Sequence, residues 1–413
     1  MKEGGTYYHD PSLPDTAIPW QYCAVEKNRT LPNVKYEVLE ELFLPESQEG
    51  TITRSSDMFA FWDDLEVEAL KITDNYDYES ETRGIGRKKW KPSGKIQMYD
   101  DTKGAYIPLR GVKVRAYSWF TTKEDLTSSD GSFRINHDFK GHVNYSIKWE
   151  RADFEIRSGH IGQAYYNGPR LKEQAWNLTI WGDLSRKYAM IHRAAHRYYY
   201  EGSAARKDLR TPPLKNEMLG RITIGAFDDK DKEGDSFMFN RWTTFPELRI
   251  FCYDSKCEDI YATTIHELAH ASHWELTGKN NYTFCDKIVK ESWARGVQIE
   301  ITKLEYPNYY TTSIAKLNYT GVVNDMIDGV KTTECFYWFN DNKNGGYVKY
   351  VNGKLEPDPK KYEDKVSDYT LKQIENALIG QRTWNGWKEN IKNKYDNETE
   401  EHLDEAFDFW GSK

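Results

Sequence analysis

The sequence predicts an α+β multidomain protein, with a small antiparallel β-sandwich followed by a mixed domain whose C-terminal part is largely helical. Residues 90–157 consist of short runs of alternating polar and apolar residues separated by turn residues, a pattern typical of antiparallel strands with one face in water. After residue 170, longer segments place apolar residues at helical spacing. The length of 413 residues also exceeds that of a typical single core. We therefore expect an N-terminal lead-in and helix at 1–88, the β-sandwich at 89–160 and the mixed domain at 170–413.

The N-terminal region begins with a polar, proline-containing lead-in up to about residue 55. Residues 57–73 then place Phe59, Trp62 and Leu65 at near-helical intervals, which predicts one amphipathic helix. The start of the chain, MKEGGTYYHDPS, has no apolar core of a signal peptide. A leader removed beforehand would leave the same start, so location has to be inferred from other features.

The β-rich region contains five expected strands: SGKIQMYDD, GVKVRAYSWF, GSFRINH, GHVNYSIKWE and ADFEIR. The residues SSDG at 128–131 predict a turn between two of them. In this pattern the segment resembles the carboxypeptidase-regulatory-like, transthyretin-type sandwich that is attached to many secreted enzymes. The resemblance implies a structural or substrate-presenting accessory domain, and binding of a surface glycan or glycoprotein is an alternative.

The mixed domain is expected to begin with a helix in SRKYAMIHRAAHRYYYEG, followed by strands in LGRITIGAFDD and PELRIFCYD. The helix that contains HELAH comes next and should end at Gly278, a favourable residue just beyond a helix C-terminus. The segment KIVKESWARGVQIEITKLEY predicts another helix, stopped by Pro307. Thr370 and Gln373 form a predicted capping box at the start of TLKQIENAL.

The chemistry of the sequence concentrates in YATTIHELAHASHWELTGK, residues 261–279. His266 and His270 are four residues apart, so on a helix their imidazoles share one face and can meet a single metal ion. Glu267, between them, can accept a proton from a metal-activated water. Glu291 in ESWARG lies on the next predicted helix and supplies a third ligand.

HELAH followed by ESWARG resembles the gluzincin metallopeptidases, which belong to the zincins. The resemblance implies a zincin-like catalytic domain with Zn²⁺ bound by His266, His270 and Glu291, and with Glu267 as the general base. It implies peptide or protein substrates, and a strand at PELRIFCYD that flanks the cleft and can pair with extended substrate backbone. It also implies an extracytoplasmic location, as in secreted, periplasmic or surface-anchored bacterial metallopeptidases. The sequence departs from thermolysin-like enzymes at Arg295, which stands where an Asp often orients a zinc-bound His.

Several residue roles stay open at this point. His273 is the alternative third ligand, although we favour Glu291 because one straight helix cannot easily present three histidines to a tetrahedral ion. Otherwise His273 is a pocket-wall or surface residue. The oxyanion donor could be any of four tyrosines: Tyr282, Tyr337, Tyr347 and Tyr350. Asp325 and Asp328 are candidates for orienting a zinc-bound His, against the alternative of solvated or capping carboxylates. We expect Arg295 in a helix-surface salt bridge, with an acidic partner residue or the substrate C-terminus as the alternative.

Composition excludes other classes of function. The net charge of −8 and the absence of a basic run argue against nucleic acid as a partner, and no window is apolar enough for a transmembrane segment. The five cysteines are too few for a disulfide scaffold, and Cys252 and Cys257 could either pair or remain buried thiols. Two rival functions remain: a non-catalytic surface binding protein with a structural zinc site, and a zinc amidase that acts on glycopeptide or other non-peptide amide bonds.

Overall fold

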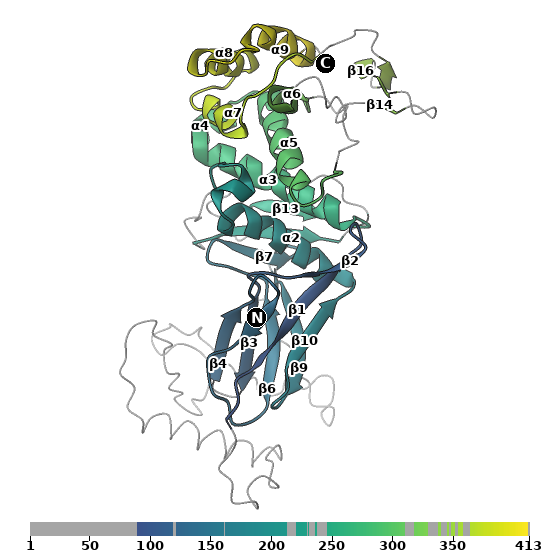
Figure 1. The fold of residues 1–413 in the computed structure, drawn as a ribbon, viewed down its shortest axis with the longest axis vertical. Helices are drawn as coiled ribbons and strands as arrows, with labels where there is room; N and C mark the ends of the chain where they lie inside the picture. The colour runs from purple at the N-terminus through teal and green to yellow at the C-terminus, as the bar shows by residue number, and fades with distance from the viewer. Residues whose placement is uncertain are drawn as a thin grey trace, which may run out of the picture. The chain divides into compact units, whose positions relative to one another are not determined.

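The computed structural model describes residues 89–118, 121–160, 162–212, 220–228, 230, 236–237, 246–309, 318–328, 338–339, 345–346, 348–351, 354–357 and 364–411. These residues all fall within one compact unit, Trp62–Lys413. They form a mixed α/β protein with eight α-helices (Figure 1). The lead-in expected at 1–88, including the helix at 57–73, lies outside the described residues.

Two four-stranded sheets make up the first part of the described chain. The first sheet contains β10 (Trp176–Ile180), β1 (Ser93–Asp100) and β2 (Ala105–Pro108) in that order, with β5 (Ser132–Arg134) also paired to β1. The second has the order β4 (Thr121–Leu126), β3 (Lys113–Ser118), β6 (Val143–Lys148) and β9 (Tyr165–Leu171). Their buried faces meet, because Tyr145 of β6 packs against Phe133 and Trp176 of the first sheet, with ring centroids 6.1 and 5.1 Å away. The alternating pattern of the sequence therefore marks the side of each strand that enters this core.

The fifth expected strand, in ADFEIR, is present but belongs to another sheet. It is β7 (Phe154–Ser158), which pairs in parallel with β11 (Ile222–Phe227). Strands β9 and β10, which follow residue 160, complete the first two sheets instead, and β10 lies parallel to β1. The expectation of a purely antiparallel unit that contains this strand was therefore wrong. Alternation of buried and exposed residues specifies a strand, whereas tertiary contacts choose its neighbour.

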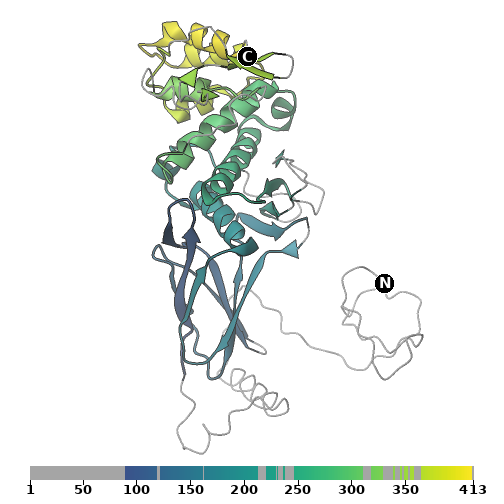
Figure 2. The ribbon, with the colours of Figure 1, turned by 90° about the vertical axis from the view of Figure 1, so that its right-hand side faces the viewer.

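The third sheet has the order β12 (Ser236–Phe237), β13 (Leu248–Phe251), β11, β7 and β8 (Gly162–Gln163). Its three middle strands are mutually parallel, and every residue of β11 is buried, as expected for a parallel strand that is covered on both faces. Helices α2 (Asp183–Tyr200) and α3 (Cys257–Thr277) pack against each other and against this sheet (Figure 2). The strands β11 and β13 and both helices confirm the segments expected from the sequence.

The remaining described elements are mainly helical. They are α4 (Lys279–Thr283), α5 (Lys287–Lys303), α6 (Val322–Asp328), α7 (Leu371–Ala377), α8 (Trp384–Lys394) and α9 (Leu403–Gly411), with 3₁₀ turns at Ser203–Arg206 and Glu400–His402 and two short hairpins, β14 (Trp338–Phe339) with β15 (Gly345–Gly346) and β16 (Val348–Val351) with β17 (Lys354–Pro357). Helix α3 ends at Gly278 with φ of 79°, and the Thr370–Gln373 capping box is formed, as predicted. None of the helices in these described ranges is long and apolar enough to cross a bilayer.

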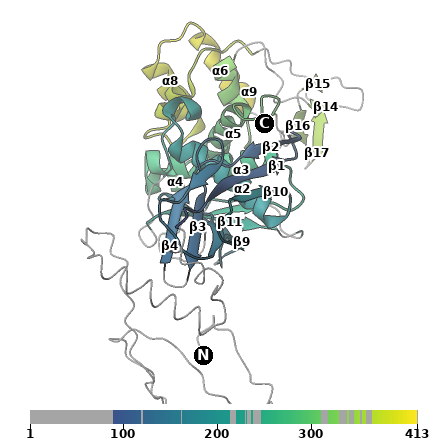
Figure 3. The same ribbon diagram turned by 60° about the horizontal axis from the view of Figure 1, so that its bottom comes forward.

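The turn between β1 and β2 joins the first part of the chain to the helices (Figure 3). Asp101 accepts a hydrogen bond of 2.8 Å from the backbone N–H of Cys257, the first residue of α3. Lys103 forms an ion pair with Glu305 just beyond α5, and Glu305 also accepts from Arg197 of α2 at 2.7 Å. Because a carboxylate at a helix start satisfies a free N–H and complements the helix dipole, this turn stabilises the start of the helix that carries HELAH.

Candidate metal centre

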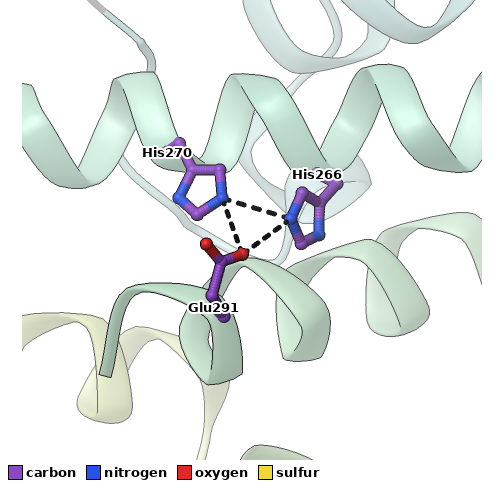
Figure 4. Close-up of side chains that lie close together, drawn as sticks. All are labelled: His266, His270 and Glu291. Carbon is purple, nitrogen blue, oxygen red and sulfur yellow. Dashed lines mark hydrogen bonds and ion pairs between the residues drawn. The ribbon is translucent and has the colours of Figure 1, made fainter. Parts of the chain in front are cut away.

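Helices α3 and α5 bring His266, His270 and Glu291 together (Figure 4). The two histidines lie one turn apart on α3, and each is less than a tenth exposed. Their Nε2 atoms are 3.1 Å apart. Glu291 Oε2 on α5 lies 3.4 Å from Nε2 of His266 and 3.3 Å from Nε2 of His270. The three atoms therefore form a nearly equilateral triangle.

This triangle matches the donor spacing of a four-coordinate metal site. Two ligand atoms bound at 2.0–2.1 Å with tetrahedral angles lie about 3.3 Å apart, and the three separations here are 3.1, 3.3 and 3.4 Å. Two imidazole nitrogens and one carboxylate oxygen are also the donor types of zinc sites that keep one position free for water or substrate. The residues present thus fit a zinc ion in both spacing and chemistry.

The outer ring nitrogens of both histidines have partners that orient the rings. His266 Nδ1 donates to Oε1 of Gln298 at 3.1 Å, since an amide oxygen can only accept. Gln298 is fixed in turn by donating to the Tyr309 hydroxyl at 2.9 Å. The Tyr282 hydroxyl lies 3.1 Å from Nδ1 of His270 and can accept its N–H. With the proton on Nδ1, the lone pair of each Nε2 points to the centre of the triangle, as metal ligation requires.

The protonation states of His266 and Glu291 also suit metal binding. Burial lowers the pKa of His266 to about 4, against the opposing effect of Glu291. Although burial alone would raise the pKa of Glu291, the imidazoles of His266 and His270 that face it hold that pKa well below the ordinary value. A neutral imidazole beside an ionised carboxylate is the combination that binds a metal without first losing a proton.

Glu267 is also buried near the three proposed ligands. Its side chain is 4 % exposed, and its charge contributes to raising the pKa of Tyr282 and of Tyr319 after the dominant effect of burial. The carboxyl group therefore lies near the two tyrosines that border the triangle.

Tyr319 is a site residue that the sequence analysis did not identify. Its ring stacks on the His266 imidazole with centroids 5.9 Å apart, and after burial the charge of Glu291 is the largest contribution that raises its pKa. The adjacent Thr320 hydroxyl donates to Ser292 Oγ at 2.8 Å, which ties this segment to α5 next to Glu291. Tyr319 belongs to no helical or strand pattern in the sequence, so only the tertiary fold reveals it.

Arg295 is buried, contrary to the expected surface salt bridge. It is 2 % exposed, and its guanidinium lies 5.3 Å from the centre of the Tyr319 ring. The cation thus lies against the aromatic ring that covers His266.

The orienting role expected of Asp325 or Asp328 falls to other residues. Asp325 accepts a hydrogen bond of 2.6 Å from the Trp410 indole of α9. The pKa of Asp328 is raised mainly by burial, with smaller effects of Lys303, which lowers it, and Asp364, which raises it. Gln298, seven residues after Glu291 on the same face of α5, takes the place on His266 that the sequence analysis sought for an Asp. The seven-residue spacing from Glu291 to Gln298 was the feature of the sequence that could have predicted this contact.

The structure places only some of the four tyrosines considered as oxyanion donors. Tyr282 is at the site, where its hydroxyl contacts His270. Tyr337 and Tyr347 lie outside the described residues, as does the side chain of Tyr350. Tyr282 is therefore the one of the four that the structure places beside the triangle.

His273 does not join the triangle. It is 1 % exposed, so it is not a surface residue, and its ring meets the edge of Tyr282 with centroids 5.1 Å apart. Burial lowers its pKa to about 3. His273 therefore packs as a neutral ring against Tyr282 and is not one of the three residues whose ligand atoms converge.

A second group of potential ligands, Asp100, Asp101 and Cys257, has structural partners. Asp101 caps α3, and Asp100 accepts from the Tyr306 hydroxyl at 2.7 Å. Burial raises the pKa of the Cys257 thiol to about 12, and its sulfur lies 3.7 Å from Nη1 of Arg186. Cys252 and Cys257 are both free and buried, which resolves the alternative between a disulfide and buried thiols.

The strand expected to pair with substrate, β13, is not at the edge of its sheet. Leu248 and Arg249 of β13 are paired with the short antiparallel strand β12. Among the described residues, β12 is therefore the outermost strand on the side of the sheet near α3.

Searches of protein-family models and of curated protein sequences give no match to this chain.

Proposed function

We propose that this protein is a zinc-dependent metallopeptidase in which His266, His270 and Glu291 hold the ion. The observation that carries the proposal is the triangle of Nε2, Nε2 and Oε2 atoms at 3.1–3.4 Å, with both outer imidazole nitrogens engaged by Gln298 and Tyr282. Two unrelated helices would have no structural reason to bury these three polar side chains against one another, because burying polar groups is costly unless a partner compensates.

A bound zinc ion would lower the pKa of a water molecule and polarise the scissile carbonyl. Glu267 takes the proton of the attacking water and delivers it to the leaving amine, as a general base and then a general acid. Its burial beside the ligands supports this role, since a carboxylate must lie within hydrogen-bond reach of the water it activates.

Tyr319 is the better candidate for stabilising the oxyanion that forms during hydrolysis. The Tyr282 hydroxyl lies at Nδ1 of His270, the ring nitrogen that faces away from the triangle, whereas the Tyr319 ring stacks on the His266 imidazole and Glu291 contributes to raising the pKa of Tyr319. A phenolic O–H can donate one hydrogen bond, and its donation to a developing oxyanion would lower the barrier to hydrolysis.

The surrounding fold supports a zincin-type catalytic part preceded by a transthyretin-type sandwich. The helix with HELAH packs on a mixed sheet whose edge strand near that helix, β12, is antiparallel to its neighbour. Among the described residues β12 is the last strand on this side of the sheet, and an edge strand can pair with the backbone of an extended peptide, so β12 replaces β13 as the proposed substrate strand. An extracytoplasmic location remains part of the proposal.

The test combines metal content and hydrolysis. Purified wild type should contain about one zinc per chain by elemental mass spectrometry, and His270→Ala and Glu291→Ala should lose it. His402→Ala, a partly exposed histidine elsewhere, is the matched control and should retain the metal. Glu267→Gln should retain zinc but lose cleavage of a peptide library.

Each alternative gives a different result. A folded wild type without zinc would refute the metal site. Zinc without Glu267-dependent cleavage of any peptide would favour a structural site, and cleavage of glycopeptide or non-peptide amides alone would favour an amidase. Loss of zinc in His273→Ala with retention in Glu291→Ala would show that the third ligand was misassigned.

A further inference from the structure

Three aromatic side chains form an exposed cluster on the outer face of the first sheet, and we name Tyr99, Tyr106 and Trp181 the aromatic platform. Trp181 is 59 % exposed and Tyr106 is 48 % exposed. The Trp181 ring stacks on Tyr99 with centroids 5.2 Å apart and an interplanar angle of 23°. Tyr106 meets both rings, at 5.6 Å from Tyr99 and 4.9 Å from Trp181. Since one ring braces another, the cluster presents a fixed aromatic surface to solvent.

A row of neutral polar groups lies beside the platform on the same face of the sheet. Gln97 precedes Tyr99 by two residues on β1, and Thr179 precedes Trp181 by two residues at β10, so their side chains point to the same side as the rings. Gln97 donates to the Thr179 hydroxyl at 2.9 Å. This bond orients both groups and leaves the amide oxygen and the hydroxyl proton available for hydrogen bonds to a ligand.

Charged side chains of the adjacent β1–β2 turn are paired within the protein. Asp101 forms an ion pair with Arg186, and Lys103 forms one with Glu305. Stacking surfaces for nucleic acid need a positively charged groove along the backbone, whereas this chain has a net charge of −8. The chemistry therefore favours an uncharged ligand that has both an apolar face and a fringe of hydroxyl groups.

We propose that the aromatic platform and the Gln97–Thr179 pair bind a neutral oligosaccharide. A pyranose ring would lay its C–H face on Trp181, and its hydroxyl groups would exchange hydrogen bonds with Gln97 and Thr179. Aromatic residues with a polar neighbour are well suited to such half-apolar ligands. This binding site goes beyond the proposed hydrolysis and stands independently of it.

The position of the platform suggests how the two sites would be used together. Asp101, two residues after Tyr99, caps α3 at Cys257, and His266 follows nine residues later, or about 14 Å along the helix. A glycan on the platform and a peptide at the metal centre could therefore belong to one glycoprotein. This last link, unlike the glycan site itself, rests on the proposed function.

Binding can be measured on the full chain carrying Glu267→Gln, so that hydrolysis does not interfere. An array of neutral oligosaccharides built from hexose and N-acetylhexosamine units is screened first, and the tightest binder is titrated by calorimetry. Trp181→Ala should weaken binding about tenfold or more, as loss of one stacking ring implies. Tyr253→Ala removes an aromatic ring that is 49 % exposed elsewhere and should leave the affinity unchanged.

Three results would overturn the glycan site. These are the absence of saturable binding across the array, binding that Trp181→Ala leaves unchanged, and preferential binding of a single-stranded oligonucleotide. Self-association of the wild type that Trp181→Ala abolishes would equally assign the platform to a contact between copies of this chain. Because Trp181 is largely exposed, its replacement should not unfold the protein. Failure of the hydrolysis assay alone would leave the glycan result intact.

Discussion

Replacement of Gln298 by Leu tests whether the ring of His266 is oriented for a metal. In the wild type, the buried Gln298 amide accepts from His266 Nδ1 at 3.1 Å and donates to Tyr309 at 2.9 Å. A leucine of similar size removes both bonds, leaves the His266 N–H without its acceptor and allows the ring to turn or change tautomer. Loss of a single such partner typically lowers metal affinity 10- to 100-fold, so we expect Gln298→Leu to fall within about that range.

The assay is a competition for zinc against a chromogenic chelator, with apo-protein stability followed in parallel by thermal unfolding. Tyr309→Phe is the matched control, because it removes the second partner of Gln298 but leaves the contact with His266 in place. We expect its zinc affinity to fall by less than about threefold. Equal zinc affinity in the wild type and Gln298→Leu, with both proteins folded, would refute the reasoning that the Gln298 amide sets the His266 tautomer.

Three further predictions concern catalysis, packing and pH. Tyr319→Phe should retain zinc but lower kcat for peptide cleavage about 100-fold, the usual effect of deleting one oxyanion donor; equal kcat in both proteins would assign that task elsewhere. Gly296→Ala should lower the free energy of unfolding by about 1–3 kcal/mol in urea titrations, because the added Cβ would lie 2.2 Å from the Val323 side chain, whereas Gly202→Ala, which meets no atom within 4 Å, should be neutral. Burial raises the pKa of the Asp328 carboxyl group from 3.8 to about 7. The folded state therefore binds the carboxyl proton more tightly than the unfolded state does. The free energy of unfolding of the wild type, relative to that of Asp328→Asn, should fall as pH rises from 4 to 7. At pH 8 the variant should be more stable by about 1 kcal/mol, a value reduced for the partial exposure of the carboxyl group, and a pH-independent difference would contradict this account.

The sequence was most informative where local rules govern structure. The HELAH helix was predicted from its apolar spacing and Gly278, and the capping box from Thr370 and Gln373, because helix starts and ends depend on residues within one turn. The convergence of His266, His270 and Glu291 was expected from the spacing of the two histidines together with what the resemblance of HELAH and ESWARG implied. The helix ends and the capping box need few long-range contacts, which is why pattern alone could predict them.

The features that the sequence did not predict depend on contacts between distant segments. The strand β7 has the same alternation as its predecessors, and only its parallel pairing with β11 assigns it to the third sheet. Tyr319 lies near Glu291 although it belongs to a segment that follows α5. Arg295 was expected on the helix surface, but the Tyr319 ring packs against its guanidinium. Side-chain pairing across the fold decides such positions, and intrinsic preference is too weak to reveal them.

The capping of α3 by Asp101, together with the placement of β7, limits how this chain could be divided or recombined. A fragment beginning at residue 170 would keep every proposed ligand, yet it would lose a strand from the interior of the sheet under α3 and the carboxylate that satisfies the first N–H of that helix. Removal or exchange of the β-rich segment would therefore also remove the support of the HELAH helix. The two parts form one structural unit.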